Sequence, residues 1–229
     1  MNEPAKLSQL TNYLLELEED PALDLTKARL SAGEDPLTII QEAQLGLRLV
    51  GERYEQGQYY VMGMMMAGEI FREIMELIQP YLQVQFSGGE RGIILLGTVK
   101  GDIHDIGKNI FSLMLRSQGF HVEDLGTEVP PSRFVEEALR LKPDVIALSG
   151  LLTVSYETMK ATVQLVHQIS DPQVAATPFI IGGGTVNAMV CAYIGADYWA
   201  SDAVVGVQIC QQIMAARSSG IKKETGKNF

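Results

Sequence analysis

The sequence contains little cysteine. Its two cysteines, Cys191 and Cys210, do not have the spacing of metal ligands. A cysteine-based metal site is therefore not expected. The simplest interpretation is a reduced cytosolic protein in which both thiols are buried.

Long apolar runs and an excess of basic residues are also missing. No uncharged apolar stretch approaches the roughly 18 residues that a membrane span needs. Residues Met1–Leu10 lack the basic start and apolar run of a signal peptide. Lys and Arg number 18 against 28 Asp and Glu, a net charge of −10, whereas phosphate backbones need clustered basic side chains. We therefore expect a cytoplasmic protein with no nucleic-acid partner and no membrane partner.

The first third of the chain, residues 1–85, has helical patterns only. Asp20-Pro21 and Asp35-Pro36 each resemble an N-cap followed by proline at the first helical position. Gly33 and Gly57 interrupt the apolar period. Helices with such short connections predict an N-terminal four-helix bundle.

Strand and helix patterns alternate after a linker. The linker candidate is Gln83–Arg91, with Ser87-Gly88-Gly89 at its centre, and the second domain is expected over residues 90–220. The expected strands are Gly92–Val99, Phe120–Leu125, Val145–Leu148, Phe179–Ile181 and Tyr198–Ala200. The expected helices are Lys108–Gln118, Pro131–Leu141, Tyr156–Ile169, Asn187–Ile194 and Ala203–Ala216. This alternation predicts a flavodoxin-like (Rossmann-like) α/β domain, whose five-stranded parallel sheet has the order 2-1-3-4-5.

A polar loop bounded by glycines, Gly101 to Asn109, separates the first strand of this domain from its first helix. The loop contains Asp102 and His104. A metal-bound imidazole usually has its other ring nitrogen held by a carboxylate, which fixes the tautomer and raises the basicity. His104 is therefore a candidate metal ligand and Asp102 its partner, with a surface or core histidine as the plainer alternative.

Two further loops follow the third and fourth strands, Ser149–Thr153 and Gly182–Gly184. Ligands of open parallel sheets bind beyond the carboxyl ends of the strands where the strand order reverses, here between the first and third strands. All three loops should meet there. The hydroxyls of Ser149 and Thr153 suit a polar ligand or a local turn. Three successive glycines suit either a flat group lying against the backbone or an awkward turn.

Several common sites are excluded. The first loop is one residue too long for a Walker loop, and Asn109 stands where that motif requires Ser or Thr. Gly182–Thr185 is not a dinucleotide fingerprint, and no Gly-x-Ser-x-Gly elbow is present. A phosphorylated receiver domain would need Asp in place of Ser149.

The segments Asp102-x-His104-x-x-Gly107, Ser149-x-Leu151 and Gly182-Gly183 resemble the signature of cobalamin-binding domains. The longer run Val99–Ile110 is similar to the version in methionine synthase and in the corrinoid proteins of methyltransferase systems. Val50–Tyr54, followed by Gly57–Tyr60, resembles the N-terminal helical cap of those proteins. The resemblance covers residues 35 to 215, nearly the whole chain.

The resemblance implies that cobalamin (methylcobalamin or another corrinoid) binds "base-off", with its tail base removed from the cobalt. His104 replaces that base as the lower axial ligand, and Asp102 and Ser149 form a relay that tunes the proton on His104. These three residues are the catalytic candidates, and Tyr198–Asp202 closes the far end of the tail pocket. The implied cofactor-binding residues are Gly101, Asp102, Ile103, His104, Asp105, Ile106, Gly107, Ser149, Leu151, Thr153, Gly182, Gly183, Gly184, Tyr60 and Met64.

The helical bundle would cap the upper face of the cofactor, with Tyr60 as the aromatic cap residue and Met64 one turn on. Related caps often carry proline where Met62 stands, so the entry angle of this cap can differ. Adaptable core packing is the plainer interpretation of the four methionines 62, 64, 65 and 66. One helix cannot bury all four on one face, which leaves some of them to face the corrin.

The function implied by the resemblance is methyl transfer by a corrinoid carrier. A substrate-specific methyltransferase would load the methyl group, a second would deliver it to tetrahydrofolate or coenzyme M, and a reductive activase is a further partner. The chain has no barrel domain to bind a substrate, so it is not expected to be catalytic alone. The alternatives are a regulatory or sensory cobalamin module, which normally needs an output domain, and the cobalamin subunit of a mutase, which need not carry this cap.

Overall fold

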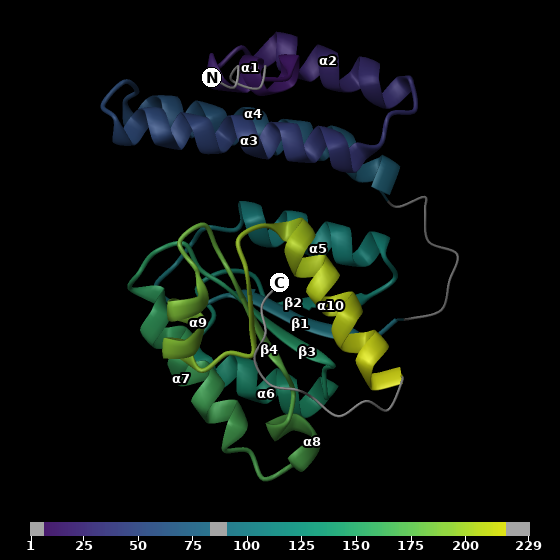
Figure 1. The fold of residues 1–229 in the computed structure, drawn as a ribbon, viewed down its shortest axis with the longest axis vertical. Coiled ribbons are helices and arrows are strands. Elements are labelled where there is room, and N and C mark those ends of the chain that lie inside the picture. Colours follow the sequence, from purple (N-terminus) through teal and green to yellow (C-terminus); the bar gives the residue numbers. More distant parts are fainter. Residues whose placement is uncertain (1–6, 83–90, 219–229) are drawn as a thin grey trace, which may run out of the picture. The chain divides into compact units, whose positions relative to one another are not determined.

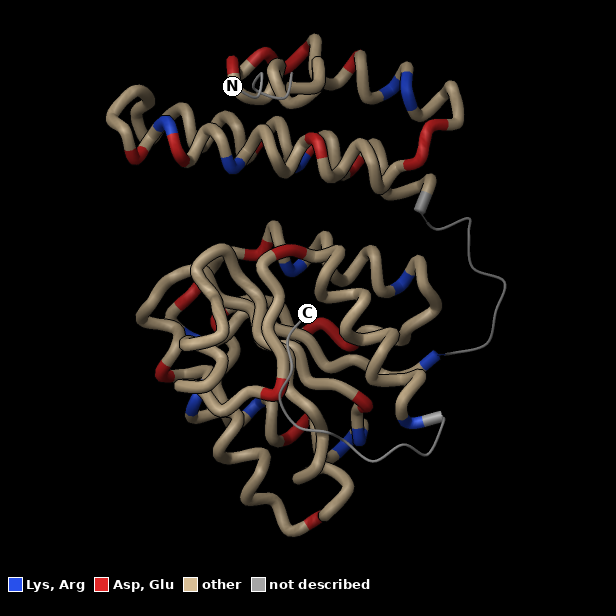
Figure 2. The backbone as a smooth tube through the Cα atoms, viewed as in Figure 1, with Lys and Arg blue, Asp and Glu red and all other residues tan. Residues whose placement is uncertain are grey.

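The chain divides into two compact units, Met1–Val84 and Gln85–Phe229, in a computed structural model that describes residues 7–82 and 91–218 (Figure 1). The predicted linker, apart from Arg91, lies outside the described residues. Figure 2 shows acidic residues on both units, with Lys and Arg interspersed among them. The division coincides with the change in the sequence from helical to alternating patterns.

Helices alone form the described part of the first unit. They are α1 (Gln9–Leu15), α2 (Glu19–Ser31), α3 (Pro36–Glu55) and α4 (Val61–Leu82). Both α1 and α4 pack against α3, and α2 packs against α4. Leu10, Leu14, Ile39, Ile70 and Ile74 are fully buried, because apolar residues at helical spacing place one face of each helix inward. The predicted four-helix bundle is confirmed.

The two Asp-Pro pairs of the first unit have different structures. Asp35 caps α3, since its carboxylate accepts a hydrogen bond from Leu37 N at 3.1 Å, and Pro36 is the first helical residue as predicted. The same prediction for Asp20-Pro21 is wrong, because α2 already begins at Glu19. Pro21 is then the third helical residue, where an N–H would have no intrahelical partner, so the helix tolerates it.

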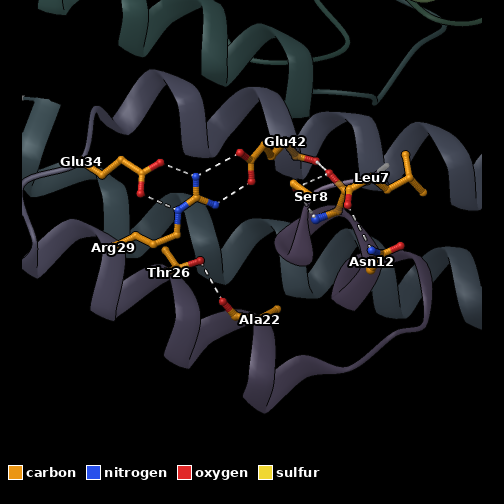
Figure 3. A network of polar contacts seen from close by, with 9 residues as sticks. Leu7, Ser8, Asn12, Ala22, Thr26, Arg29, Glu34 and Glu42 are labelled. Carbon is orange, nitrogen blue, oxygen red and sulfur yellow. Dashed lines mark hydrogen bonds and ion pairs between the residues drawn. The ribbon is translucent and has the colours of Figure 1, made fainter. Parts of the chain in front are cut away.

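Arg29 joins α2 to α3 in the first unit (Figure 3). Its guanidinium donates to Glu34 Oε2 at 2.8 Å and to the two oxygens of Glu42 at 2.6 and 3.0 Å. The hydrogen bonds to Glu34 and Glu42 raise the pKa of Arg29. The same hydrogen bonds lower the pKa of Glu34 and of Glu42 below the ordinary 4.5, although burial raises both pKa values. The guanidinium is thus held between two carboxylates of its own unit.

The second unit contains a five-stranded parallel sheet of order β2-β1-β3-β4-β5, as predicted. The strands are β1 (Ile93–Thr98), β2 (His121–Asp124), β3 (Val145–Ser149), β4 (Phe179–Gly182) and β5 (Tyr198–Ala200). At the carboxyl ends, Thr98 pairs with Ser149, and Ser149 pairs with Gly182. The last residues of β1, β3 and β4 therefore lie side by side, and the three candidate loops leave the sheet from neighbouring positions.

Helices cover both faces of this sheet. They are α5 (Ile106–Ser117), α6 (Pro131–Leu141), α7 (Ser155–His167), α8 (Pro172–Ala175), α9 (Ala188–Ile194) and α10 (Ala203–Ser218). Helices α5 and α10 pack together on one face, and α6, α7 and α9 lie on the other (Figure 1). The larger core belongs to the second face, where Leu95, Ile146 and Phe179 of the strands meet Phe134 and Met159 of the helices.

Several details of the second unit differ from the predictions. Helix α5 begins at Ile106 instead of Lys108, so Ile106 and Gly107 belong to its first turn instead of the loop. Helix α7 begins at Ser155, one residue early. The short helix α8 was not predicted. Within residues 7–82 and 91–218, each helix is too short or too polar to cross a bilayer.

Candidate functional site

The loop after β1 is fixed by hydrogen bonds on both sides. The chain turns at Gly101, whose φ of +93° favours glycine. Thr98 Oγ1 donates to the carbonyl oxygen of His104 at 3.0 Å, and Gly101 N donates to Glu128 Oε1 at 3.0 Å. Glu128 follows β2 and itself has a φ of +56°, an uncommon conformation for a residue with a side chain. The turn is therefore braced from within and from the β2 side before α5 begins at Ile106.

Asp102 and His104 form the polar centre of this loop. His104 Nδ1 lies 2.6 Å from Asp102 Oδ1, and the same oxygen accepts a hydrogen bond from His104 N at 3.0 Å. The Asp102 side chain is fully buried, whereas the His104 side chain is 48% exposed. The Nδ1 side of the imidazole is thus held by a buried carboxylate, while the ring remains accessible to solvent.

The second oxygen of Asp102 is held by the loop after β3. Asp102 Oδ2 accepts hydrogen bonds from Leu151 N at 2.6 Å and from Leu152 N at 2.8 Å. Burial raises the pKa of Asp102, but the hydrogen bonds from Leu152, from His104 and from Leu151 outweigh it, and the net pKa is lowered. Asp102 therefore stays ionised at neutral pH, and its Oδ1 can accept a hydrogen bond from His104 Nδ1.

Ser149 lies at the end of β3, between Thr98 and Gly182. Its carbonyl oxygen accepts a hydrogen bond from Val99 N at 3.1 Å. The donors to Asp102 Oδ2 in the described structure are backbone N–H groups instead of the Ser149 hydroxyl. The relay through Ser149 stays a prediction.

Glycines let the loops after β3 and β4 approach each other. A Cβ on Gly183, whose φ is +151°, would overlap the carbonyl oxygen of Gly150. In contrast, a Cβ on Gly182 would have Ala200 O as its nearest neighbour at 3.9 Å, and a Cβ on Gly184 would have Leu151 Cδ1 at 3.5 Å. Gly183 is therefore required by the backbone, whereas a side chain at Gly182 or Gly184 would make only ordinary contacts.

The remaining predicted residues of the second unit lie in the same loops. Asp105 is the N-cap residue of α5, and its carboxylate accepts a hydrogen bond from Asn109 Nδ2 at 3.0 Å. Gly107 lies in the first turn of α5 with open space where a Cβ would be. Ile103 is 70% exposed and Leu151 38% exposed, and Thr153 is also exposed.

The sequence reasoning missed four residues that hold these loops. As described above, Leu152 donates its backbone N–H to Asp102, and the carboxylate of Glu128 accepts a hydrogen bond from Gly101 N. Lys108 is buried and forms an ion pair with Asp124 at the end of β2. A lysine directly after the glycine of the loop was a signal that could have found this pair, because buried lysines are almost always paired.

Tyr60 and Met64 belong to the first unit. Tyr60 directly precedes α4 and is 88% exposed, and Met64 in the first turn is 40% exposed. Met62, Met65 and Met66 are exposed as well. Core packing, the plainer interpretation of the methionines, is therefore wrong within this unit, and the start of α4 presents an apolar surface.

Comparison with known proteins decides the family. A family described as B12 binding domain matches residues 92–208, and a second family of the same description matches residues 7–79. The chain belongs to the cobalamin (B12)-binding family. It therefore binds cobalamin or a related corrinoid as its cofactor.

Named relatives point the same way. Trimethylamine corrinoid protein 1 of Methanosarcina acetivorans is 33% identical over 200 residues, 86% of this chain and 91% of that protein. The dimethylamine corrinoid protein of Methanosarcina barkeri is 30% identical over 219 residues, 94% of this chain and all of that protein. The structure of the monomethylamine corrinoid protein of Methanosarcina barkeri superposes with a TM-score of 0.82 at 27% identity, covering 90% of this chain and 97% of that one.

The residues at the sheet edge fit a corrinoid. A corrin ring is flat and largely apolar, and its cobalt would take a nitrogen ligand from the protein. The accessible imidazole of His104 suits the cobalt, and its Nδ1 has the carboxylate that metal-bound histidines usually have. Ile103 beside it, and Leu151, Leu152 and Val154 in the loop after β3, expose aliphatic side chains that an apolar ring could cover.

Proposed function

We propose that this chain is a corrinoid methyl carrier that binds cobalamin base-off with His104 on the cobalt. It would accept a methyl group from a substrate:corrinoid methyltransferase and give it up to a second methyltransferase that serves tetrahydrofolate or coenzyme M. The observation that carries the proposal is the buried, ionised Asp102 bound to the accessible imidazole of His104. The bound corrinoid supplies the methyl-carrying metal, and the protein supplies its lower ligand and its shielding.

The second unit would hold the His104 imidazole in place through Asp102. Asp102 accepts the proton of Nδ1, and the N–H groups of Leu151 and Leu152 keep the carboxylate in place. With Nδ1 held by Asp102, Nε2 would be the ring nitrogen that meets the cobalt. Ser149, Thr153, Gly182 and Gly184 would line the pocket for the displaced tail of the cofactor.

The first unit would shield the other face of the cofactor. The exposed surface at the start of α4, including Tyr60 and Met64, is apolar and rich in the flexible methionine side chains that adapt to an irregular partner. Such a cover would exclude water between transfers and would have to move for each methyltransferase.

The relatives' names support methylamines as the methyl donors. Three of them are called trimethylamine, dimethylamine and monomethylamine corrinoid proteins. The partners would then be a methylamine:corrinoid methyltransferase, an acceptor methyltransferase and a reductive activase. Incubating the loaded, reduced protein with such a methyltransferase and each methylamine, and measuring demethylated amine, tests the donor. Demethylation with methanol and its methyltransferase in place of a methylamine would contradict the choice.

The cofactor arrangement is tested by reconstitution with hydroxocobalamin. His104→Ala should change the visible spectrum of the bound corrinoid and remove the nitrogen splitting from the paramagnetic resonance of its Co(II) form. His121→Ala is the matched control, because His121 is an exposed histidine at the start of β2. An unchanged spectrum in His104→Ala would contradict the assignment of His104 as the ligand.

A further inference from the structure

The turn between α3 and α4 carries two successive tyrosines in different surroundings. Tyr60 is 88% exposed, whereas Tyr59 is partly buried. The Tyr59 hydroxyl donates to the carbonyl oxygen of Leu15 at 2.6 Å and accepts a hydrogen bond from Arg53 Nη1 at 3.0 Å. This one hydroxyl therefore ties the turn to the end of α1 and to the last turn of α3.

Arg53 completes the link between the two turns of the first unit. Its guanidinium also donates to Glu16 Oε1, directly after α1, at 2.9 Å, and its Cζ lies 5.4 Å from the centre of the Tyr59 ring. The carbonyl oxygen of Arg53 accepts a hydrogen bond from Gln58 N at 2.8 Å. Because a guanidinium is planar and rigid, it can hold a carboxylate and lie near an aromatic ring at the same time. The side chain and the backbone of Arg53 thus both hold the turn.

We propose that Tyr59 and Arg53 are positioning residues for Tyr60 and for the apolar start of α4. Tyr59 and Tyr60 share one peptide group, so anchoring the first side chain limits where the chain can place the second. The carbonyl oxygen of Tyr60 accepts a hydrogen bond from Gly63 N at 2.8 Å, which closes the first turn of α4. A Cβ on Gly63 would have Tyr59 Cγ at 3.5 Å, so this first turn lies against the anchored ring.

The use of a fixed Tyr60 rests on the proposed function, in which this side chain covers the upper face of the cofactor. A loop that must become ordered when its ligand binds loses part of the binding free energy to that ordering. Hydrogen bonds made within the first unit would remove this loss, because they fix the turn before the cofactor arrives. The anchoring itself is tested on the full chain without cofactor, so it can fail independently.

Tyr59→Phe removes the hydroxyl and keeps the ring. The chain is labelled with 3-fluorotyrosine, and the fluorine resonance of Tyr60 is assigned by its loss in Tyr60→Phe. In Tyr59→Phe we expect the Tyr60 resonance to shift and Gly63 N–H to exchange about tenfold faster, the effect of losing a hydrogen bond to a charged group. The amide of Ile74 in the middle of α4 should be unchanged, whereas a general loss of stability would affect it as well.

Tyr13→Phe is the matched control. Tyr13 is also partly buried in the first unit, and its hydroxyl accepts a hydrogen bond from Gln9 Nε2 at 2.6 Å within α1. This variant should leave the Tyr60 resonance and the exchange of Gly63 unchanged. If Tyr59→Phe behaves like Tyr13→Phe, the proposal is overturned.

Two further variants test the arginine. Arg53→Met keeps the length of the side chain and removes its donors, and it should act on Tyr60 and Gly63 as Tyr59→Phe does. Glu16→Gln changes an exposed partner of Arg53, so its effect on the exchange of Gly63 should be only about twofold. An Arg53→Met protein with the wild-type Tyr60 resonance and Gly63 exchange would remove Arg53 from the proposal.

The same labelled chain, loaded with cobalamin and reduced to Co(II), separates this proposal from the proposed function. A paramagnetic cobalt broadens the fluorine resonance of a tyrosine close to it. The Tyr60 resonance should be broadened in the wild type and less broadened in Tyr59→Phe, and equal broadening in both would contradict the positioning role. A wild-type Tyr60 resonance that Co(II) leaves unchanged would overturn the cover given in the proposed function, while the result without cofactor would stand.

Discussion

The molecule has two networks of charged groups, one around Arg29 in the first unit and one around Asp102 in the second. They stabilise their carboxylates in different ways. In the first unit, Arg29 lies between Glu34 and Glu42, and the cation itself lowers the pKa of both carboxylates. In the second unit, Asp102 accepts four hydrogen bonds, three from backbone N–H groups and one from an imidazole. Here backbone donors, instead of a cation, keep the carboxylate ionised against the opposing effect of burial.

We interpret this difference as that between a structural clamp and the proposed ligand site. A cation beside Asp102 would compete with His104 for the carboxylate, whereas fixed N–H groups stabilise the negative charge and leave one oxygen for the imidazole. The Arg29 network closes on its own residues and joins two helices. The Asp102 network ends in the half-exposed imidazole ring of His104.

The largest effect on stability is expected where the loops after β3 and β4 meet, beside the backbone that supplies these N–H groups. Gly183→Ala should lower the stability of the second unit by about 4 kcal/mol, because the new Cβ would overlap Gly150 O in a conformation that already favours glycine. Native-state hydrogen exchange in β3 and β4 measures this, and α3 should be unaffected. Gly184→Ala is the control, with Leu151 Cδ1 at 3.5 Å. Equal losses in the two variants would show that the close approach is not real.

Removing the carboxylate itself should have the next largest effect. Asp102→Ala leaves the N–H groups of Leu151, Leu152 and His104 without their acceptor, and should cost about 3 kcal/mol of stability in the second unit. Hydrogen exchange of the β1 and β3 amides provides the measurement. A variant as stable as the wild type would mean that the loop after β3 finds other acceptors, and that Asp102 does not organise it.

Removing the charge of Arg29 from its network with Glu34 and Glu42 should cost less stability than removing Asp102. Arg29→Met keeps the length of the side chain and removes the charge, and we expect a loss of about 1 kcal/mol in the first unit, since both glutamates can turn toward water. Exchange of α2 and α3 amides measures the change. If Arg29→Met destabilised the first unit more than Asp102→Ala destabilised the second, the ranking of the two networks would be reversed.

The Arg29 clamp should also make the stability of the first unit depend weakly on pH. The folded pKa values of Glu34 and Glu42 are lowered from 4.5, so their contribution is complete above that pH and is lost as the pH falls through the folded pKa values. The first unit should therefore lose stability in acid, by less than about 1 kcal/mol for each partly exposed group. Urea unfolding of wild type and Arg29→Met between neutral and acid pH measures it. Parallel curves for the two proteins would contradict the clamp.

Most of the fold was predictable because it follows from local pattern. Alternating apolar runs and amphipathic helices gave the sheet order, and Asp35-Pro36 marked the start of α3 correctly. The same Asp-Pro signal misplaced the start of α2, where tertiary packing continues the helix past it. At Asp171-Pro172 the signal was present and unused, because the four residues of α8 are too few to show a period.

The candidate site was predictable only where side chains carry the chemistry. Asp102 and His104 stand out by residue type, and the structure brings them together. The partners of Asp102 Oδ2 do not stand out, because any residue except proline could supply the N–H groups of Leu151 and Leu152. The sequence shows the three glycines but not which of them is required. Only the fold shows that a Cβ on Gly183 would overlap Gly150, while a Cβ on Gly182 or Gly184 would make ordinary contacts.

The most direct test of the central claim labels the histidines of the protein with ¹⁵N. The chain is loaded with unlabelled cobalamin, reduced to Co(II), and studied by paramagnetic resonance. If His104 is the axial ligand, the nitrogen splitting should change from the triplet of ¹⁴N to the doublet of ¹⁵N, and His104→Ala should abolish it. A triplet that persists in the labelled protein would show that the cofactor's own base remains on the cobalt, and would contradict the account.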